Sequence, residues 1–211
     1  RQLFEGLSVT KNVKLCDEWM NKYPTIFLTL KGVEGRDYSS ALGQVSYLIK
    51  RILIEHSYLL SSEKIDPVDK ASLTVLKQGE GNENDMVNAL NLLCSTLETY
   101  YGKQVILLID EYDVPINHAE QNGYYKEMIG FMRNLLGSAL KTNPSLKFAV
   151  LTGCLRIARE SIFTGLNNFK CYGVSDALYA DKFGFTSVEV DRILSDAGLS
   201  EKKFLFKKLL N

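Results

Sequence analysis

The residues with the clearest capacity for chemistry follow a short aliphatic run. Residues 105–109 are five consecutive aliphatic side chains, and Asp110, Glu111 and Asp113 come immediately after them. A run of this length is too short to cross a membrane and is typical of a strand buried in a parallel sheet. Open α/β sheets bind ligands in the crevice beyond the carboxyl ends of their strands. We therefore expect these acids to lie at a ligand site.

Two adjacent carboxylates at such a place suggest metal-assisted phosphate chemistry. Asp110 would hold Mg²⁺, directly or through water, because this cation prefers oxygen ligands. Glu111 would polarise a water that attacks a γ-phosphate. The plainer interpretation is a strand that ends in solvated acids. Asp113 fits either a supporting acid or a cap for the turn at Pro115, and we favour the cap.

Composition argues against several classes of protein. The chain has 25 basic and 25 acidic residues, so no overall charge attracts it to nucleic acid or to a membrane surface. No apolar run approaches the roughly 20 residues of a transmembrane helix. Four cysteines without a C-x-x-C pair, and only two histidines, disfavour structural zinc. We expect Cys94 and Cys154 to be buried free thiols, which suits a cytoplasmic protein.

Strand and helix patterns alternate along the chain, and this alternation predicts a parallel α/β sheet. The expected strands are 25–30, 105–109, 147–153 and a short one at 169–174. The expected helices are 16–23, 38–56, 85–100 with Asp85 as its cap, 124–141 and 187–196. Residues 61–83 and 115–123 are expected to be loops.

Five short blocks occur in a recognisable order. They are LFEGL at 3–7, IDEYDVP at 109–115, NGYY at 122–125, LTGCLRIA at 151–158 and ESIFTGLNN at 160–168. Together they resemble successive blocks of the AAA-ATPase-like family. The resemblance implies a three-layer α/β fold of the P-loop NTPase type, with a parallel sheet. We expect this core to cover residues 1–180, and a small helical segment to follow at 181–211.

The resemblance also assigns site residues. Asp110 and Glu111 match the family's Walker B pair, and Thr152 ends the strand that resembles sensor 1, where a hydroxyl can reach the γ-phosphate or the attacking water. Arg156 can stabilise charge on a transferring phosphoryl group. Two plainer interpretations stay open. Thr152 can belong to a Thr-Gly turn that needs a positive φ at Gly153, and Arg156 can be a surface ion-pair residue.

A function follows from these assignments. The resemblance implies a domain that binds ATP and Mg²⁺ and hydrolyses ATP as a switch for an attached effector, such as a C-terminal PD-(D/E)XK nuclease-like domain. One alternative is a degenerate, non-catalytic interaction module on the same scaffold. Another is a metal-dependent nuclease or phosphoesterase whose ligands are Asp110, Glu111 and Asp113. The sequence indicates no oligomeric state.

One departure from the family matters for all three hypotheses. Family members carry a Walker A segment ending in GKS or GKT before the LFEGL block, and this chain contains neither triplet. We expect the P-loop to precede Arg1, and its strand to lie in the sheet between 147–152 and 169–174. Strand 147–152 should then have one unpaired edge. Because an open inner edge promotes aggregation, residues 1–211 alone should be insoluble and bind ATP no better than ~mM.

Overall fold

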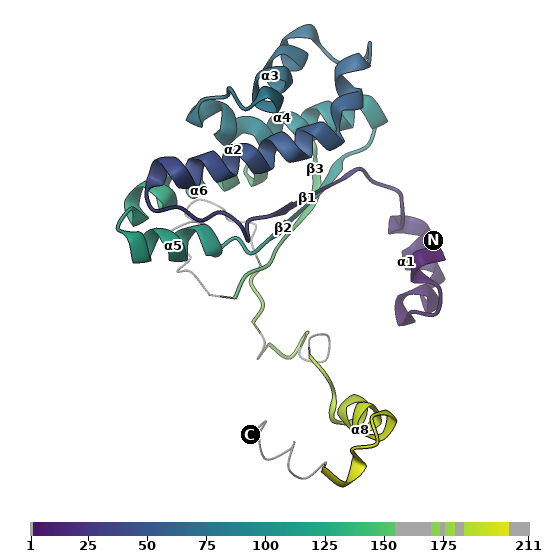
Figure 1. Cartoon of the computed structure of the whole chain (residues 1–211). Helices are drawn as coiled ribbons and strands as arrows, with labels where there is room; N and C mark the ends of the chain where they lie inside the picture. Colours follow the sequence, from purple (N-terminus) through teal and green to yellow (C-terminus); the bar gives the residue numbers. More distant parts are fainter. Residues whose placement is uncertain (1, 155–169, 174–175, 180–183, 203–211) are drawn as a thin grey trace. The chain divides into compact units, whose positions relative to one another are not determined.

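A parallel sheet forms the centre of the first of two units into which the chain divides. The computed structural model describes residues 2–154, 170–173, 176–179 and 184–202. The first unit is Arg1–Leu166 and the second is Asn167–Asn211. Figure 1 shows the sheet of the first unit beneath a layer of helices.

The described elements of the first unit alternate as the sequence predicts. Its strands are β1 (Thr25–Thr29), β2 (Val105–Asp110) and β3 (Leu146–Leu151). Its α-helices are α1 (Val13–Trp19), α2 (Tyr38–Glu55), α3 (Pro67–Gln78), α4 (Glu83–Tyr101), α5 (Val114–Asn122) and α6 (Tyr125–Leu140). Short 3-10 helices are η1 (Gln2–Phe4), η2 (Ser8–Lys11) and η3 (Ser57–Ser61).

All strand pairs of the described sheet are parallel, in the order β1-β2-β3. Thr29 of β1 lies opposite Asp110 of β2, and Ile109 lies opposite Leu151 of β3. The carboxyl ends of the three strands therefore lie side by side. This register confirms the predicted parallel α/β sheet and places Asp110 at the middle of that edge.

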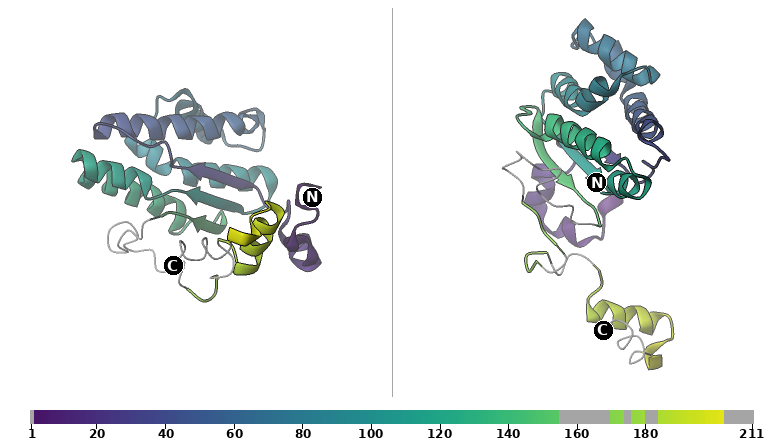
Figure 2. Two further views of the ribbon diagram at one scale, coloured as in Figure 1. Left: turned by 60° about the horizontal axis from the view of Figure 1, so that its bottom comes forward. Right: turned by 90° about the vertical axis from the view of Figure 1, so that its left-hand side faces the viewer.

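The two faces of the sheet differ in what covers them. Val105, Leu107 and Ile109 are buried, and Figures 1 and 2 show α2, α4 and α6 along a single face. On the alternating positions, Phe27 and Phe148 are 59% and 53% exposed. The Trp19 ring contacts Phe148 edge to face, with centroids 6.4 Å apart. Period-two alternation thus separates a helix-covered face from a face that is largely open among the described residues.

The outer edge of β3 agrees with the sequence expectation. Among the described residues, β3 pairs with β2 and with no other strand. The expected strand at 169–174 is wrong over residues 170–173, and its end residues lie outside the described ranges. The chain turns here instead, because Asp176 binds the Gly173 amide through its carboxylate and donates its own N–H to the Gly173 carbonyl.

Two segments expected to be loops contain helices. Within 61–83 the structure has α3, which starts at Pro67 after Asp66 accepts a hydrogen bond from Val68 N at 2.8 Å. Proline suits the first turn of a helix, where its missing N–H has no partner to lose. Within 115–123 the structure has α5, and Pro115 again lies in the first turn of the helix. Both prolines therefore mark helix starts.

Helix boundaries elsewhere follow local chemistry closely. The N-cap of α4 is Asn82, and Asp85, which was expected to be the cap, is its partner in a capping box. The two side chains satisfy each other's backbone N–H groups, at 3.1 Å and 2.9 Å. Gly102 ends the helix in the left-handed region, as expected, with φ 64°.

The second unit contains α8 (Ser187–Asp196) and the 3-10 helix η4 (Ser200–Lys202) among its described residues. The bounds of α8 match the predicted helix. Thr186 and Glu189 form its capping box, and hydrogen bonds from Thr186 hold the pKa of Glu189 below its usual value. None of the described helices, in either unit, combines the length and apolar character that a membrane crossing needs.

Candidate functional site

The end of β2 is tied to both neighbouring strands by its backbone. Leu30 N donates to Asp110 O at 2.9 Å, and Thr152 N donates to Ile109 O at 2.9 Å. One residue further, Tyr112 N donates to Thr152 O at 3.2 Å. The ladder thus continues past the last residues of the strands and fixes the acidic turn, residues 110–113, against the end of β3.

Asp110 and Thr152, both predicted as site residues, are in direct contact. The Thr152 hydroxyl donates to Asp110 Oδ1 at 2.5 Å, and the Glu111 backbone N–H donates to the same oxygen at 3.0 Å. Both donors approach Oδ1, so the described residues leave Oδ2 as the oxygen without a protein hydrogen bond. Asp110 is half-buried, and Thr152 is exposed.

Glu111 has an unusual backbone. Its φ is 55°, in the left-handed region that residues other than glycine rarely adopt. This conformation costs roughly 1–2 kcal/mol for an L-residue. Its carbonyl accepts Val114 N at 3.2 Å, which closes the turn into α5, and the residue is half-buried. The chain therefore changes direction directly after β2, and Glu111 stays at the strand end beside Asp110.

Asp113 is buried against the end of β3. It is 2% exposed, and a Cβ on Gly153 would lie 2.5 Å from its Oδ1 and 2.9 Å from Tyr112 Cε1. Asp113 occupies the N-cap position of α5 but its side chain makes no cap hydrogen bond, so the favoured role as a side-chain cap is wrong. Its backbone carbonyl makes the first hydrogen bonds of the helix, by accepting Ile116 N and Asn117 N.

The same contact corrects the interpretation of Gly153. One of the two open interpretations of this segment was a Thr-Gly turn with a positive φ, yet Gly153 is not among the residues with positive φ. Its reason is close approach: the Asp113 carboxylate and the Tyr112 ring fill the space that a side chain would take. Sequence alone could not reveal this, because the contact joins residues forty positions apart.

The loop between β1 and α2 is fastened to the helices that follow the acids. Tyr124, at the start of α6, is buried and donates its hydroxyl to Gly35 O at 2.8 Å. His118 of α5 lies with Nε2 3.3 Å from Glu34 Oε1. These residues hold the edge of the site, and the NGYY block was the signal that could have identified Tyr124.

The donor set suits a cation that keeps most of its waters. No group of three or more His, Cys, Asp or Glu residues within the described ranges can hold a metal ion by itself. Mg²⁺ is commonly bound by one or two carboxylates together with waters and substrate phosphates. Asp110 Oδ2 with Glu111 nearby fits that demand. A nuclease centre built from Asp110, Glu111 and Asp113 fits poorly, because Asp113 is packed against Gly153.

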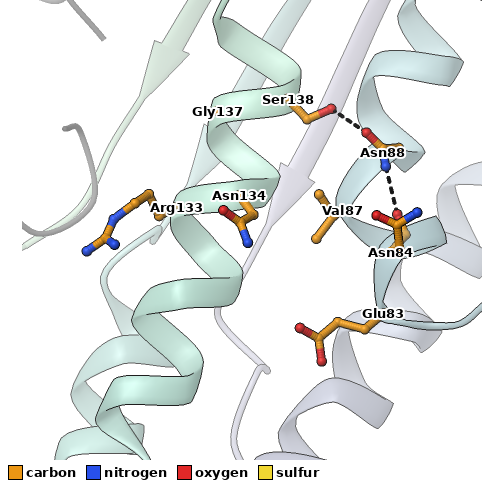
Figure 3. A pocket seen from close by; sticks show the side chains of 8 residues that line it. All are labelled: Glu83, Asn84, Val87, Asn88, Arg133, Asn134, Gly137 and Ser138. Atoms are coloured by element: carbon orange, nitrogen blue, oxygen red, sulfur yellow. Dashed lines mark hydrogen bonds between the residues drawn. The ribbon is translucent and has the colours of Figure 1, made fainter. Parts of the chain in front are cut away.

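A separate hollow of about 650 Å³ lies between α4 and α6. Figure 3 shows Asn88 bridging Ser138 and Asn84, and Arg133 extending from the side of α6 away from α4. The hollow is open, and its lining contains none of the predicted site residues. We place the candidate site at the acidic turn because the Asp110 carboxylate, Glu111 and Thr152 lie together there, at the carboxyl ends of β2 and β3.

Two further expectations concern the segment after β3. Arg156 lies outside the described residues, so its role stays a prediction. Cys154 is exposed, which corrects the expectation of a buried thiol; β3 ends at Leu151, and the chain has left the sheet by that point. Cys94 is buried as expected, and burial raises its pKa to about 11.

Comparison with known proteins identifies the family. A family model described as "Predicted AAA-ATPase" matches residues 1–163 of the 211. The chain belongs to this predicted AAA-ATPase family. The matched residues include the three described strands and the acidic turn. The expected AAA-ATPase-like identity is therefore confirmed.

A relative of this AAA-ATPase-like chain occurs in Azotobacter chroococcum mcd 1, where it is described as an uncharacterized protein in the vnfD 5′ region. The two are 32% identical over 95 residues, which is 44% of this chain and 18% of the relative. The chain thus spans less than a fifth of the length of that relative. No solved structure matches the chain.

Proposed function

We propose that this domain binds Mg-ATP and hydrolyses it, with Asp110 directed at the metal and Glu111 at the attacking water. The observation that carries the proposal is the meeting of Asp110, Glu111 and Thr152 at the carboxyl ends of adjacent parallel strands. Open α/β sheets bind their ligands at this edge. Family membership supports ATP as the ligand.

Each carboxylate has a distinct task. When bound, Mg²⁺ neutralises charge on the phosphates, and Asp110 holds it through Oδ2, directly or through a water. Glu111 accepts a hydrogen bond from the attacking water and orients it toward the γ-phosphate. The left-handed backbone of Glu111 supports this assignment, because strain of this kind concentrates at functional sites.

The phosphate cradle would lie at the edge of β3 that no described strand covers. A further strand pairing with β3 would end next to Thr152, and the loop after that strand would face Asp110 across the site. Backbone N–H groups of such a loop, at the start of a helix, bind phosphate well. Arg156, which follows β3 by five residues, would add positive charge near the transferring phosphoryl group.

Hydrolysis would serve as a switch. A γ-phosphate that contacts the acidic turn would shift its position, and phosphate loss would reverse the shift. The turn continues into α5, and α5 and α6 hold the β1–α2 loop through His118 and Tyr124. A change at the phosphate would therefore reach the surface of the domain. The effector that responds, such as a nuclease-like domain in the same protein, follows from the family resemblance.

The test compares Glu111→Gln with Glu120→Gln in the full-length natural protein. Glu120 is an exposed carboxylate of α5, so its substitution controls for loss of one charge near the site. We expect Mg-ATP binding in all three proteins and loss of hydrolysis in Glu111→Gln alone. If wild type binds ATP and shows no Glu111-dependent hydrolysis, the scaffold is a non-catalytic module. Cleavage of nucleic acid without ATP would favour the phosphoesterase alternative.

A further inference from the structure

We infer that Thr152 is a positioning residue that fixes the Asp110 carboxylate and thereby selects Oδ2 as the oxygen presented to the metal. The inference rests on the proposed function, because it concerns how Asp110 meets Mg²⁺. It replaces the expected role of Thr152 as a direct sensor of phosphate.

The hydrogen-bond pattern around Asp110 carries the argument. Two donors converge on Oδ1: the Thr152 hydroxyl at 2.5 Å and the Glu111 N–H at 3.0 Å. An Asp side chain has a broad χ2 preference, so without such donors its two oxygens can exchange places. Two donors on one oxygen remove that freedom. The lone pairs of the other oxygen then remain directed at a ligand.

Thr152 can do this because its own backbone is held on both sides. Its N–H donates to Ile109 O, and its C=O accepts Tyr112 N, so the residue bridges the end of β2 and the acidic turn. Gly153 continues the contact by packing against Asp113. A held backbone, together with the few χ1 rotamers of a β-branched residue, restricts the direction of the hydroxyl. Ligands of a metal are commonly oriented by partners of this kind.

The same geometry argues against direct phosphate sensing. A threonine hydroxyl has one hydrogen to donate, and Thr152 donates it to Asp110. A phosphate oxygen accepts hydrogen bonds and would compete with Asp110 for that hydrogen. A hydrogen bond from the Thr152 hydroxyl to phosphate would therefore break the one to Asp110. The Asp110 carboxylate would then lose its orienting partner while Mg-ATP is bound. Positioning and sensing are alternatives for this side chain.

The experiment measures Mn²⁺ binding to the full-length protein in the presence of a non-hydrolysable ATP analogue. Thr152→Val replaces the hydroxyl by a methyl group at nearly constant volume, and Thr152→Ser keeps the hydroxyl. Thr29→Val is the matched control, because Thr29 lies opposite Asp110 on β1 while its hydroxyl oxygen accepts Lys31 N at 3.4 Å. Loss of an orienting partner typically weakens metal binding about 10–100-fold.

We expect Thr152→Val to raise the half-saturating Mn²⁺ concentration about 10–100-fold, with Thr152→Ser and Thr29→Val close to wild type. The affinity of the analogue without metal should be unchanged, since the hydroxyl makes no phosphate contact. Wild-type Mn²⁺ binding by Thr152→Val would overturn the inference, as would an equal shift in Thr29→Val. A weaker metal-free affinity in Thr152→Val would restore the phosphate sensor.

Two measurements keep the outcome interpretable. Thermal unfolding of each variant shows whether the domain is folded, and Thr152→Ala replaces Thr152→Val if the valine variant is not. Asp110→Asn tests the proposed function separately. If Asp110→Asn leaves Mn²⁺ binding unchanged, Asp110 does not hold the metal and the proposed function fails. If Asp110→Asn weakens binding and loss of the Thr152 hydroxyl does not, the inference on Thr152 alone fails.

Discussion

The helical crossover from β1 to β2 and the acidic turn after β2 are built in opposite ways. In the crossover, α2 and α4 both begin with a capping box, and α3 and α4 end at glycines whose φ values are 83° and 64°. These are the residues that local preferences demand at helix ends. Hydrogen bonds from Ser40 hold the pKa of the N-cap Asp37 below its usual value.

The acidic turn departs from the same preferences. Glu111 occupies the left-handed region with φ 55°, where glycine would fit without strain. Asp113 stands at the start of α5 and makes no side-chain cap, and its carboxylate is buried beside Gly153. No comparable departure occurs at the described ends of α2, α3 and α4.

The difference separates scaffold from site. Natural sequences tend to satisfy local preferences wherever nothing else is required, and they depart from them at functional or strained positions. On this argument, the crossover supplies stability, and the acidic turn holds side chains for a ligand. Substitutions in the two regions should accordingly change different quantities, and each of the following predictions tests that separation.

The largest effect is expected for Glu111→Gln in the full-length protein. Because glutamine cannot accept the proton of the attacking water, ATP hydrolysis should fall about 10²–10⁴-fold, as is typical when a general base is lost. Mg-ATP binding should persist, since the amide keeps the shape of the side chain. Steady-state phosphate release measures the first quantity and nucleotide titration the second. Unchanged turnover would reject Glu111 as the base.

Asp110→Ala should reduce the dependence of nucleotide binding on Mg²⁺. The substitution removes the carboxylate that faces the metal, so nucleotide binding in the presence of Mg²⁺ should weaken. The loss should be at least about tenfold, because removing even a residue that only orients a metal ligand weakens binding by that much. Binding without Mg²⁺ should change little. Parallel titrations with Mg²⁺ and with EDTA measure both. Equal Mg²⁺ dependence in wild type and variant would make Asp110 structural.

Gly153→Ala should affect the turn through packing. The new Cβ would lie 2.5 Å from Asp113 Oδ1, so either the turn or β3 must move. Overpacking of this kind destabilises a protein by about 1–3 kcal/mol. Urea unfolding measures the loss. Gly43→Ala is the control, because a Cβ there meets nothing within 4 Å. A Gly153→Ala variant as stable as Gly43→Ala would show that the contact is not tight.

Sequence patterns located the three described strands and the acids, because these depend on local signals. The aliphatic run at 105–109 predicted β2, and the residues after it predicted the site. The spacing of apolar residues predicted α2 and α8 with nearly the observed bounds. Local signals for the other two helices are Pro67 after the N-cap Asp66 for α3, and Pro115 for α5.

The remaining features of the site depend on contacts between distant residues. The Thr152–Asp110 hydrogen bond and the packing of Gly153 on Asp113 arise only when β2 and β3 pair in the observed register. The left-handed φ of Glu111 contradicts the preference of its residue type, so no local pattern could predict it. Sequence patterns thus indicated Asp110, Glu111 and Thr152 as site residues, and the strand register determined the contact between Asp110 and Thr152.

Asn82→Ala tests the scaffold side of the comparison. It removes the capping box of α4 and should cost about 1 kcal/mol of unfolding free energy, the usual effect of losing an N-cap. Hydrolysis by the folded protein should be unchanged, because α4 contributes to the site only through the position of β2. Urea unfolding and phosphate release, measured on the same preparation, separate the two quantities. A loss of turnover without a loss of stability would place α4 within the site.

The smallest expected effect, and the most discriminating one, is that of Glu111→Gly on stability. Glycine relieves the left-handed strain, worth about 1–2 kcal/mol, and adds about 0.5–1 kcal/mol of chain entropy to be lost on folding. The variant should therefore be more stable than wild type by a fraction of a kcal/mol to about 1 kcal/mol, while hydrolysis falls as in Glu111→Gln.

Thr142→Gly provides the matched comparison, since Thr142 also has a left-handed backbone, with φ 54°, and lies on the exposed turn before β3. It should show the same gain in stability with no change in hydrolysis, because strain is relieved there without removing a site residue. Urea unfolding and phosphate release, measured on both variants, test the pair. If Glu111→Gly destabilises the protein while Thr142→Gly stabilises it, the Glu111 side chain holds the fold, and the acidic turn belongs with the scaffold.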